Sequence, residues 1–576
     1  MYSNVKNVQL LVSMLKERQV KNIVVSPGNS HNAIVRSIEE DGYFKTYNIV
    51  DERSAAFFGC GLIQQLNAPV AIMCTAGTAA TNYLTGVTEA SRRKLPLIVI
   101  TADKNPYYLG QQEDQMVEQI NLFKRLVKHS VSLPMIKDSK DDWYCRRLLS
   151  EVFIEMEHHG KGPVHINVPI EEGMLAIGPT FTTTELPKIK MIEKIDNRTS
   201  SEKVKSKFEC LKGKKILVVC GQDNNISEKR KKNIEKIFGN YNCIFSTDKL
   251  SNLHCDGVLE TSRVSMNLKY AGNFKQIVPD IVITIGGNVA WEGKFLLKVY
   301  NDSFEHWIIN EEGKVQDYYK NLTTVFEMNT DEFLEIMATY EVDKSKEYYG
   351  TWEKLDNEFK IPEFEYSNLY VTQKVMNNLP KDSILNLANS LTIRIAQYFD
   401  MDESIQVYCN RGVNGIDGCM STYIGQSAVT DKLSFLIIGD LTFFYDMNAL
   451  WNRYLEKNIR IMLVNNGGAA LFHFNQGVKM FPTLNENVAA EHFATAKGWV
   501  ESQNMKYLTA KNKEEFDENL KQFLSTDSDK PIVFEVFTDK AIDAEVQKKF
   551  FMYNLNKKDK IKNEVKTIIK KAIWGK

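Results

Sequence analysis

Two polar turns in the last third of the sequence hold residue types that bind a metal ion and phosphates. Asp440 follows an apolar run that ends in Gly439, and Asn466 ends a second apolar run just before Gly467 and Gly468. Neighbouring parallel strands end at the same edge of a sheet, so these side chains are expected to face one crevice. A carboxylate, an amide oxygen and a backbone carbonyl match the oxygen ligands of Mg²⁺, and the glycines leave room for phosphates.

The first third of the sequence carries a second set of polar residues after apolar runs. Glu52 comes at the expected end of a strand and starts a helix rich in small residues. The stretch VVSPGNSHN (24–32) places Ser30 beside His31, which raises the alternative of a serine hydrolase. Adjacent residues on a turn point in different directions, and the second glycine of a GxSxG elbow is absent. The pattern therefore disfavours that alternative.

The elements that position these residues repeat in three blocks of alternating strands and helices. Such alternation predicts α/β domains, each with a parallel sheet covered by helices on both faces. We expect a first domain at 1–185, a central domain at 207–341 and a third domain at 362–550. A polar linker is expected at 186–206, and a second polar stretch, 342–360, precedes the third domain. The expected strands are 22–26, 69–75, 96–101 and 162–169; 214–221, 242–246, 280–287 and 305–310; and 383–389, 405–410, 433–440, 459–466 and 531–537.

The composition of the 576 residues is that of an ordinary globular protein, with 43% apolar and 25% charged residues. A formal net charge of −1 gives no global preference for nucleic acid or an anionic membrane. Nine scattered cysteines without a CxxC pair are typical of reduced thiols. The N-terminus shows no signal-peptide pattern, and no apolar run is long enough to span a bilayer, so we expect a cytoplasmic protein.

The C-terminal segment 556–576 differs from the rest of the chain. It holds eight lysines, and its apolar residues recur at helical spacing. This basic amphipathic pattern predicts a helix packed on its own protein. Contact with an anionic membrane surface or with a partner is the alternative.

Several motifs in this order resemble the thiamine-diphosphate-dependent 2-oxoacid decarboxylases and carboligases. They are the glutamate after a strand, TAGTAATN (75–82), GPVHINVP (162–169) and the GD…NN pair described above. The resemblance covers essentially residues 1–550 and implies that family's pyrimidine-binding, central and diphosphate-binding domains. It is strongest for the branch of the 2-succinyl-5-enolpyruvyl-6-hydroxy-3-cyclohexene-1-carboxylate synthases of menaquinone biosynthesis, on ANSLTIR (388–394), YCNRGVNGIDGCMST (408–422) and NVAWEGKFLL (288–297).

The resemblance implies thiamine diphosphate and Mg²⁺ as cofactors. Glu52 matches the catalytic glutamate that hydrogen-bonds the pyrimidine ring, and Ile416 matches the apolar wedge between the two cofactor rings. The matching cofactor anchors are Thr78, Gly439, Asp440, Thr442, Asn466 and Gly468, of which Asp440, Asn466 and Gly468 would hold the metal. The family places each cofactor between the first domain of one subunit and the third domain of another, which implies a dimer or tetramer with shared sites.

The donor substrate implied by the resemblance is 2-oxoglutarate. Ser390, Arg394 and Arg411 fall on positions that match recognition of its distal carboxylate. Guanidinium groups bind carboxylates in a two-pronged geometry, which suits this role. The expected reaction is decarboxylation of this 2-oxoacid and transfer of the resulting acyl unit to a second small molecule.

The acceptor side departs from the branch. These synthases usually carry Ser-Arg after SPG, and the arginine binds the carboxylated acceptor isochorismate; this chain has Asn29 and Ser30, followed by His31. The other positions on this side are Lys104 in place of an arginine, Asp114 in place of an asparagine, a retained Lys294, and a smaller apolar loop that leads into Leu471 and Phe472.

Loss of one positive charge and gain of one negative charge disfavour a dianionic acceptor. We therefore expect a less anionic carbonyl or enoyl acceptor rather than isochorismate. The authentic synthase reaction of menaquinone biosynthesis is the alternative, and a catalytically inactive binding homologue is a further one.

Overall fold

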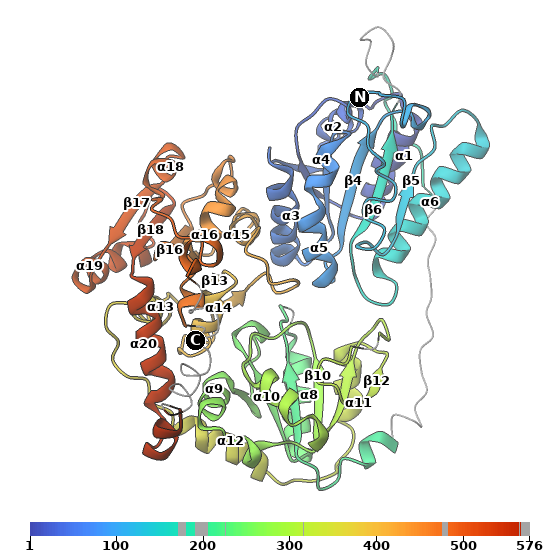
Figure 1. The fold of residues 1–576 in the computed structure, drawn as a ribbon. Helices are drawn as coiled ribbons and strands as arrows, with labels where there is room; N and C mark the ends of the chain where they lie inside the picture. The colour runs from blue at the N-terminus through green and yellow to red at the C-terminus, as the bar shows by residue number, and fades with distance from the viewer. Residues whose placement is uncertain are drawn as a thin grey trace. The chain divides into compact units, whose positions relative to one another are not determined.

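The computed structural model describes residues 1–170, 180–189, 206–224, 226–314, 316–474, 482–563 and 565. The strands form three six-stranded sheets, in the orders β2-β1-β3-β4-β6-β5, β12-β11-β10-β7-β8-β9 and β14-β13-β15-β16-β18-β17 (Figure 1). The neighbouring strands run parallel, as in β1–β3, β7–β10 and β13–β15. This confirms the predicted α/β class with three parallel sheets.

The first sheet has its core strands buried on both faces. Its strands are β1 (Asn22–Val25), β2 (Lys45–Asn48), β3 (Val70–Cys74), β4 (Leu97–Asp103), β5 (Ser130–Ser132) and β6 (Val164–Pro169). Helices α3 (Glu52–Leu66), α4 (Thr78–Asn82) and α5 (Leu84–Arg92) cover one face, and α1 (Lys6–Glu17), α2 (Asn32–Glu39) and α6 (Ser139–Glu157) cover the other (Figure 1). Two-sided burial explains why β3, β4 and β6 read as continuous apolar runs.

The second sheet is sandwiched in the same way. It holds β7 (Ile216–Cys220), β8 (Cys243–Thr247), β9 (Val258–Glu260), β10 (Ile281–Ile285), β11 (Glu305–Ile309) and β12 (Leu322–Phe326). One face packs on α8 (Glu228–Asn240) and α11 (Thr330–Met337), and the other on α9 (Ser262–Ala271), α10 (Gly293–Val299) and α12 (Glu347–Asn357). The polar stretch 342–360 contains α12, whose Tyr348 and Trp352 lie one helical turn apart and are both buried in this core.

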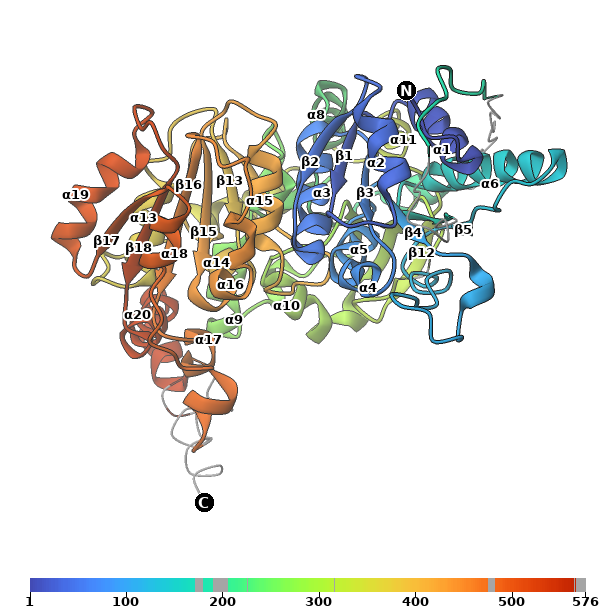
Figure 2. The same ribbon diagram turned by 90° about the horizontal axis from the view of Figure 1, so that it is seen from above.

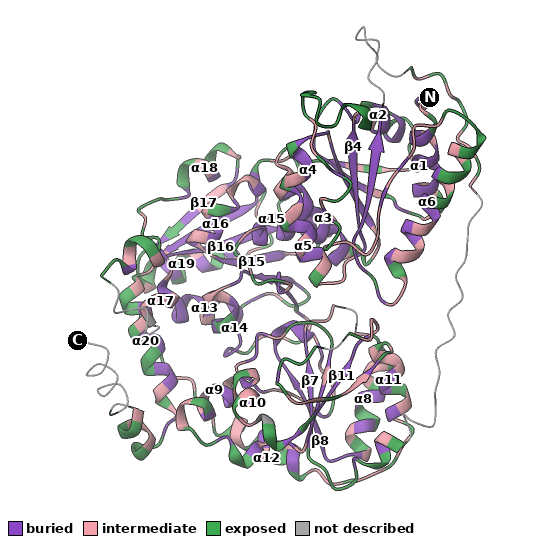
Figure 3. Cartoon of the chain, turned by 45° about the vertical axis from the view of Figure 1, so that its right-hand side comes forward, coloured by how far each residue is buried: buried purple, intermediate pink, exposed green. Residues whose placement is uncertain are grey.

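The third sheet packs on an apolar core that includes Leu385, Phe435 and Phe534. Its strands are β13 (Ile384–Leu387), β14 (Gln406–Tyr408), β15 (Ser434–Gly439), β16 (Ile459–Asn465), β17 (Lys506–Ala510) and β18 (Ile532–Phe537). The helices in this part of the sequence include α13 (Asn368–Met376), α14 (Leu391–Ala396), α15 (Cys419–Ser427), α16 (Asp440–Tyr445), α17 (Ala470–Phe474), α18 (Lys497–Ser502), α19 (Lys513–Leu524) and α20 (Lys540–Tyr553). Buried residues fill the strands of each sheet, and exposed residues lie on the outer sides of helices such as α6 and α8 (Figure 3).

Contacts group the chain into two compact units. The first contains Met1–Asp196, Asn410–Lys432 and Phe444–Ile459, and the second contains Asn197–Cys409, Leu433–Phe443 and Arg460–Lys576. Helix α15 belongs to the first unit because it packs closely on α3. A Cβ atom on Gly61 would lie 2.0 Å from the Thr422 carbonyl oxygen, and one on Gly425 would lie 2.3 Å from that of Phe58. The predicted domain boundaries stay predictions.

The remaining predictions concern the tail, the cysteines and the membrane. Most of 556–576 and of the linker 186–206 lies outside the described residues, but 557–563 are helical and Asn563 Nδ2 donates to the Tyr270 carbonyl at 2.8 Å. All nine cysteines lie among the described residues and are free thiols. No helix in the described ranges is long and apolar enough to cross a bilayer.

Candidate active site

The polar turns after β1 and β3 lie where the strand order of the first sheet reverses direction. Strands β1 and β3 lie side by side (Figure 2), while β2 flanks β1 on the other side, so the crevice opens at the carboxyl ends of β1 and β3. The turn after β1 and the turn after β3 touch there. The Ser30 backbone N–H donates to Thr75 Oγ1 at 3.1 Å, and a Cβ on Gly28 would lie 2.4 Å from Thr75 Cβ.

Ser30 and His31 do not form a nucleophile–base pair. Both are buried, and neither Ser30 Oγ nor His31 Nδ1 has a hydrogen-bond partner among the described residues. Burial lowers the pKa of His31 to about 4, so its ring is neutral at pH 7. Asn29 is exposed and its Oδ1 accepts a hydrogen bond from Asn32 Nδ2 at 2.8 Å. The turn therefore presents polar side chains that carry no charge at pH 7.

Glu52 is the first residue of α3, directly after β2. Asp51 caps the helix by accepting the Ser54 backbone N–H at 3.2 Å, which leaves the Glu52 side chain free of the capping role. Asn82 Nδ2 donates to Glu52 Oε2 at 3.1 Å. Thr78 is exposed at the start of α4, in the same turn-and-helix segment as Asn82.

Lys104 follows β4 and is already paired within the first unit. Its Nζ lies 2.8 Å from Glu113 Oε1, and the Lys104 side chain is only 12% exposed. Asp114, the next residue along, is exposed. Lys104 and Asp114 were predicted from the sequence, but Glu113 was not. The Glu113 carboxylate compensates the positive charge of Lys104.

A buried polar network that the sequence analysis missed lies behind these turns. Asn167 Nδ2 donates to Asp103 Oδ2 at 2.9 Å, and Asn167 Oδ1 accepts from Thr101 Oγ1 and Gln119 Nε2. Gln119 Oε1 in turn accepts the Gly77 backbone N–H at 2.9 Å. The network fixes the turn before Thr78 and the strand end before Lys104. The signal in the sequence was the polar residues inside the apolar runs of β4 and β6.

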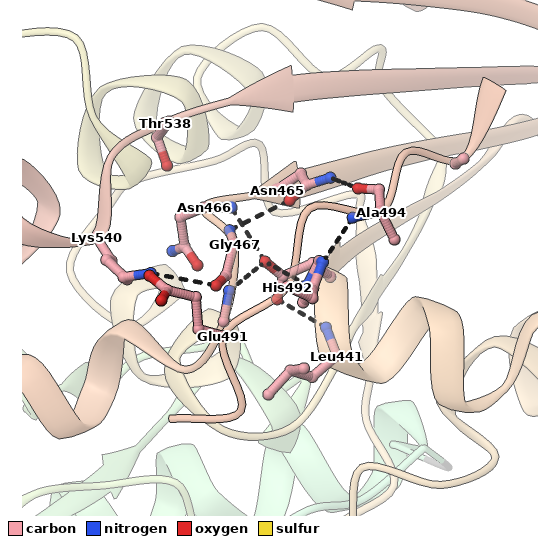
Figure 4. A network of polar contacts seen from close by, with 12 residues as sticks. Leu441, Asn465, Asn466, Gly467, Glu491, His492, Ala494, Thr538 and Lys540 are labelled. Carbon is pink, nitrogen blue, oxygen red and sulfur yellow. Dashed lines mark hydrogen bonds and ion pairs between the residues drawn. The ribbon is translucent and has the colours of Figure 1, made fainter. Parts of the chain in front are cut away.

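The third sheet brings Asp440 and Asn466 together directly after β15 and β16. Figure 4 shows Asn466 within its network of polar contacts. The buried Asp440 carboxylate accepts three backbone N–H groups, from Leu441 at 2.7 Å, Gly468 at 2.9 Å and Asn466 at 3.1 Å. Burial raises the pKa of Asp440, and these hydrogen bonds oppose the rise. The carboxylate is therefore fixed in place at the strand end.

The residues around Asp440 fit a metal ion with phosphate ligands. Asn466 Oδ1 is buried and has no partner among the described residues, while Asn466 Nδ2 is held by Asp543 Oδ2 at 3.0 Å. An oxygen left bare beside a fixed carboxylate suits Mg²⁺, which prefers hard oxygen ligands. Gly468 has φ +140° and no room for a side chain, since a Cβ would lie 2.7 Å from the Ala489 carbonyl oxygen. Thr442 is buried nearby on α16, and Gly439 ends β15.

A segment behind the glycine turn was not predicted from the sequence. The His492 backbone N–H donates to the Gly467 carbonyl at 3.2 Å, and Lys540 Nζ donates to the same oxygen at 3.3 Å (Figure 4). Lys540 also pairs with Glu491, and His492 Nε2 lies 3.4 Å from Asp440 Oδ2. These contacts hold the Gly467–Gly468 turn against the segment that contains Glu491.

The remaining residues predicted to bind donor, acceptor or cofactor fall in both units. In the second unit, Ser390 has φ +73° before α14, Arg394 lies 3.9 Å from Glu292 Oε1, and Lys294 Nζ donates to the Val289 carbonyl at 3.2 Å. In the first unit, Arg411 is buried and Ile416 is 36% exposed. Leu471 and Phe472 are half-buried in α17. The structure thus places Arg394 beside the segment that carries Lys294.

Comparisons with known proteins agree with this geometry. The family model of the thiamine pyrophosphate enzyme N-terminal TPP-binding domain matches residues 5–122. A 2-succinyl-5-enolpyruvyl-6-hydroxy-3-cyclohexene-1-carboxylate synthase of Phocaeicola vulgatus is 39% identical over 97% of this chain and 100% of its own length. Synthases of the same name from Bacteroides thetaiotaomicron and Flavobacterium johnsoniae are 36% and 30% identical, over 96% and 93% of this chain and 99% and 97% of their own lengths.

The chain belongs to this synthase family. As a member of the synthase family it is a thiamine-diphosphate-dependent enzyme of the decarboxylating carboligase type, with thiamine diphosphate and Mg²⁺ as cofactors. This confirms the family, the enzyme class and the cofactors predicted from the sequence. The roles of the individual site residues stay predictions.

Proposed function

We propose that this chain decarboxylates 2-oxoglutarate and transfers the resulting acyl unit to a carbonyl or enoyl acceptor that is less anionic than isochorismate. Bound thiamine diphosphate supplies the electron sink for loss of CO₂ and the nucleophilic carbon for the transfer. The chain's own residues bind, orient and exchange protons. Asp440, Asn466 and the Gly468 backbone would hold the Mg²⁺–diphosphate group.

Glu52 is proposed to hold a proton for the cofactor's pyrimidine ring. Its carboxylate stands at the end of β2, bonded by an amide N–H of Asn82 and not used as the helix cap. Ser390 and Arg394 are proposed to bind the distal carboxylate of the donor, where a guanidinium group and a hydroxyl supply complementary donors. Glu292, 3.9 Å from Arg394, would orient that guanidinium group.

The observation that carries the acceptor proposal is that the turn after β1 holds no positive charge of its own at pH 7 and that Lys104 is paired. Ser30 is neutral, His31 is neutral at pH 7, and Lys104 is paired with Glu113. Strands β1 and β4 are separated by β3, so Lys104 lies about 10 Å along the sheet edge from this turn. A dianionic acceptor would lose its hydration at this turn without gaining the paired hydrogen bonds that an arginine guanidinium group supplies.

A second candidate is the synthase reaction named for the relatives. It is favoured by identity of up to 39% over nearly the full length of both chains. The two candidates share the cofactors, the donor and the fold, and they differ in the acceptor alone.

One assay separates the two candidates. Purified protein with thiamine diphosphate, Mg²⁺ and 2-oxoglutarate is supplied either with isochorismate or with a panel of aldehydes and uncharged enones, and CO₂ and product masses are measured. The proposal predicts CO₂ release with products from the panel and little from isochorismate. Efficient turnover of isochorismate would overturn it and establish the synthase reaction. CO₂ release with any acceptor also excludes an inactive homologue.

A variant sharpens the assay. Glu113→Gln releases Lys104 from its ion pair and should improve KM for anionic acceptors by about tenfold, because a charge-assisted bond becomes available. Glu118→Gln is the matched control, since Glu118 is an exposed glutamate of the same segment that bonds Asn121 instead. Equal effects of the two variants would contradict the part assigned to Lys104.

The assembly and location follow from the family resemblance. We propose a dimer or tetramer in which Glu52 of one copy and Asp440 of another serve one cofactor, and we propose that the enzyme acts in the cytoplasm, where its nine thiols stay reduced. Sedimentation velocity with and without cofactor measures the assembly directly, and a monomer that turns over substrate would contradict it.

A further inference from the structure

Helix α5 holds a buried carboxylate that the proposed mechanism does not use. Glu89 is 1% exposed and lies within the first unit beside the loop 410–418. The loop follows β14 and carries both Arg411 and Ile416, the residues predicted to bind donor and cofactor. A carboxylate buried to this extent requires hydrogen bonds and a counter-charge to remain ionised.

The loop backbone supplies those hydrogen bonds. Glu89 Oε1 accepts the Gly412 N–H at 3.1 Å, and Oε2 accepts the Val413 N–H at 3.2 Å. Burial raises the pKa of Glu89, and Arg93 and these two N–H groups oppose the rise. The contact joins residues more than 300 positions apart in the chain.

Arg93, the residue directly after α5, bonds the start of the same loop. Its Nε lies 4.0 Å from Glu89 Oε1, and its Nη1 donates to Asn410 Oδ1 at 3.2 Å. Its Nη2 donates to Gln64 Oε1 on α3 at 2.6 Å. Asn410 Nδ2 closes the loop by donating to the Gly418 carbonyl at 3.2 Å.

The glycines of the loop are required by this contact. A Cβ on Gly412 would lie 2.7 Å from Glu89 Oε2 and 2.9 Å from Arg92 Cβ. A Cβ on Gly418 would lie 2.1 Å from Phe57 Cγ on α3. The loop is therefore pressed onto α3 and α5 at both ends, with Arg411 and Ile416 between the two contacts.

We propose that Glu89 is a positioning residue that, with Arg93, fixes the loop 410–418 so that Arg411 and Ile416 reach the donor and the cofactor. This rests on the proposed function, together with the roles that the family resemblance implies for those two residues. A buried ion pair adds little net stability compared with apolar side chains of the same volume, so its presence is better explained by the geometry that it imposes on the loop.

The test is Glu89→Gln in the full-length protein with thiamine diphosphate and Mg²⁺. Glutamine has nearly the same shape, but its amide N–H₂ would face the N–H groups of Gly412 or Val413, so the loop shifts. We expect weaker binding of thiamine diphosphate and a higher KM for 2-oxoglutarate, each by about tenfold, with a smaller fall in kcat. The matched control is Asp138→Asn, which also removes a carboxylate that accepts two backbone N–H groups.

Two further measurements keep the test decisive. Gly412→Ala disturbs the same contact from the loop side, so it should reproduce both effects, and the double variant should be no worse than the worse single one. Cofactor binding is measured by calorimetry and by the cofactor-dependent melting shift, neither of which depends on the donor. If the wild type fails to use 2-oxoglutarate, the proposed donor fails and the binding arm still tests Glu89.

Unchanged cofactor binding and unchanged KM in a folded Glu89→Gln variant would overturn the inference. So would additive effects of Glu89→Gln and Gly412→Ala, because independent sites add and a shared contact does not.

Discussion

The first and third sheets have the same strand order, and each presents polar loops at the carboxyl ends of corresponding strands. Ser30 follows β1 and Ser390 follows β13, each the second strand from the same edge of its sheet. Thr78 follows β3 and Asp440 follows β15 at the neighbouring position. One topology thus carries two different sets of polar side chains, and the side chains decide what each set can bind.

The difference between the two halves is in how the key carboxylate is held. Asp440 is buried and fixed by three backbone N–H groups, which suits a metal ligand that must not move. Glu52 is half-buried and is bonded by one side-chain amide, from Asn82. A carboxylate with a single neutral partner remains available to share a proton with a ligand. The comparison predicts that Glu52, beside the first sheet, takes part in proton transfer. It predicts that Asp440, beside the third sheet, binds the metal ion.

Glu52→Gln is expected to have the largest effect. Glutamine keeps the shape and the bond with Asn82 but cannot share a proton, so kcat should fall by about 10³-fold while the cofactor still binds. Turnover is measured as CO₂ release, and binding as the melting shift with thiamine diphosphate and Mg²⁺. Near-wild-type turnover would remove the catalytic assignment of Glu52.

Asp440→Asn should produce the opposite pattern. An amide cannot neutralise Mg²⁺, and its N–H₂ would face the N–H groups of Asn466 and Gly468, so the cofactor-dependent stabilisation should disappear. For a ligand at 100 times its Kd this stabilisation is about 2.7 kcal/mol. Asp431→Asn, an exposed aspartate, is the control and should keep the full shift. A full shift in Asp440→Asn would place the metal elsewhere.

The two inactive variants together test whether the halves meet across copies. Co-expressed Glu52→Gln and Asp440→Asn chains would form mixed dimers in which one site has both wild-type residues. Activity should then return, although each variant alone is inactive. No recovery in a mixed dimer confirmed by mass would show that both residues act within one copy.

Acidification should destabilise the first sheet through His165. This histidine is buried in β6 between Thr101 and Ser130, and burial lowers its pKa to about 3. The unfolded chain binds a proton near pH 6.5 and the folded chain does not, so stability falls as the pH drops from 6.5 toward 3. At pH 5 the loss is about 2 kcal/mol. His165→Gln should flatten the urea-midpoint curve over this range, and an unchanged slope would contradict the assignment.

The sequence predicts the centre of each sheet better than its edges. The predicted strands have a counterpart at every central position, because two-sided burial demands continuous apolar runs. The expected strand ranges leave out β2, β5, β9, β12 and β17, all at sheet edges, where few residues are buried and no such run exists. Likewise α12 was hidden in a polar stretch because two aromatic residues alone anchor it.

The site divides in the same way. Asp440 and Asn466 come together because they follow the neighbouring strands β15 and β16, and the spacing of these strands fixes the distance between the two turns. The partners of Lys104 and of the loop at Gly412 were not predictable, because Glu113 and Glu89 reach them through packing that no local pattern encodes. The residues that could not be predicted are chiefly those that hold the predicted residues in place.

The smallest predicted effect concerns backbone strain. It is seen by comparing the residue before α4, beside the first sheet, with the residue before α14, beside the third sheet. Ser390 (φ +73°, ψ −123°) and Gly77 (φ +91°, ψ −139°) both precede a short helix at a strand-end crevice. Only glycine adopts this region readily, so Ser390 stores strain of about 1–3 kcal/mol. Ser390→Gly removes that strain, and the extra freedom of the unfolded chain offsets about 0.4–1 kcal/mol of the gain.

The net stabilisation of Ser390→Gly should therefore be about 1 kcal/mol, measured by urea unfolding, and it should be accompanied by a higher KM for 2-oxoglutarate. The reciprocal Gly77→Ser should destabilise the fold, because its Cβ would lie 3.0 Å from the Gln115 carbonyl oxygen in a backbone region that serine avoids. A less stable Ser390→Gly variant would show that the serine hydroxyl supports the fold. A more stable variant with weaker donor binding would show that the strain is tolerated because the hydroxyl is used on the donor.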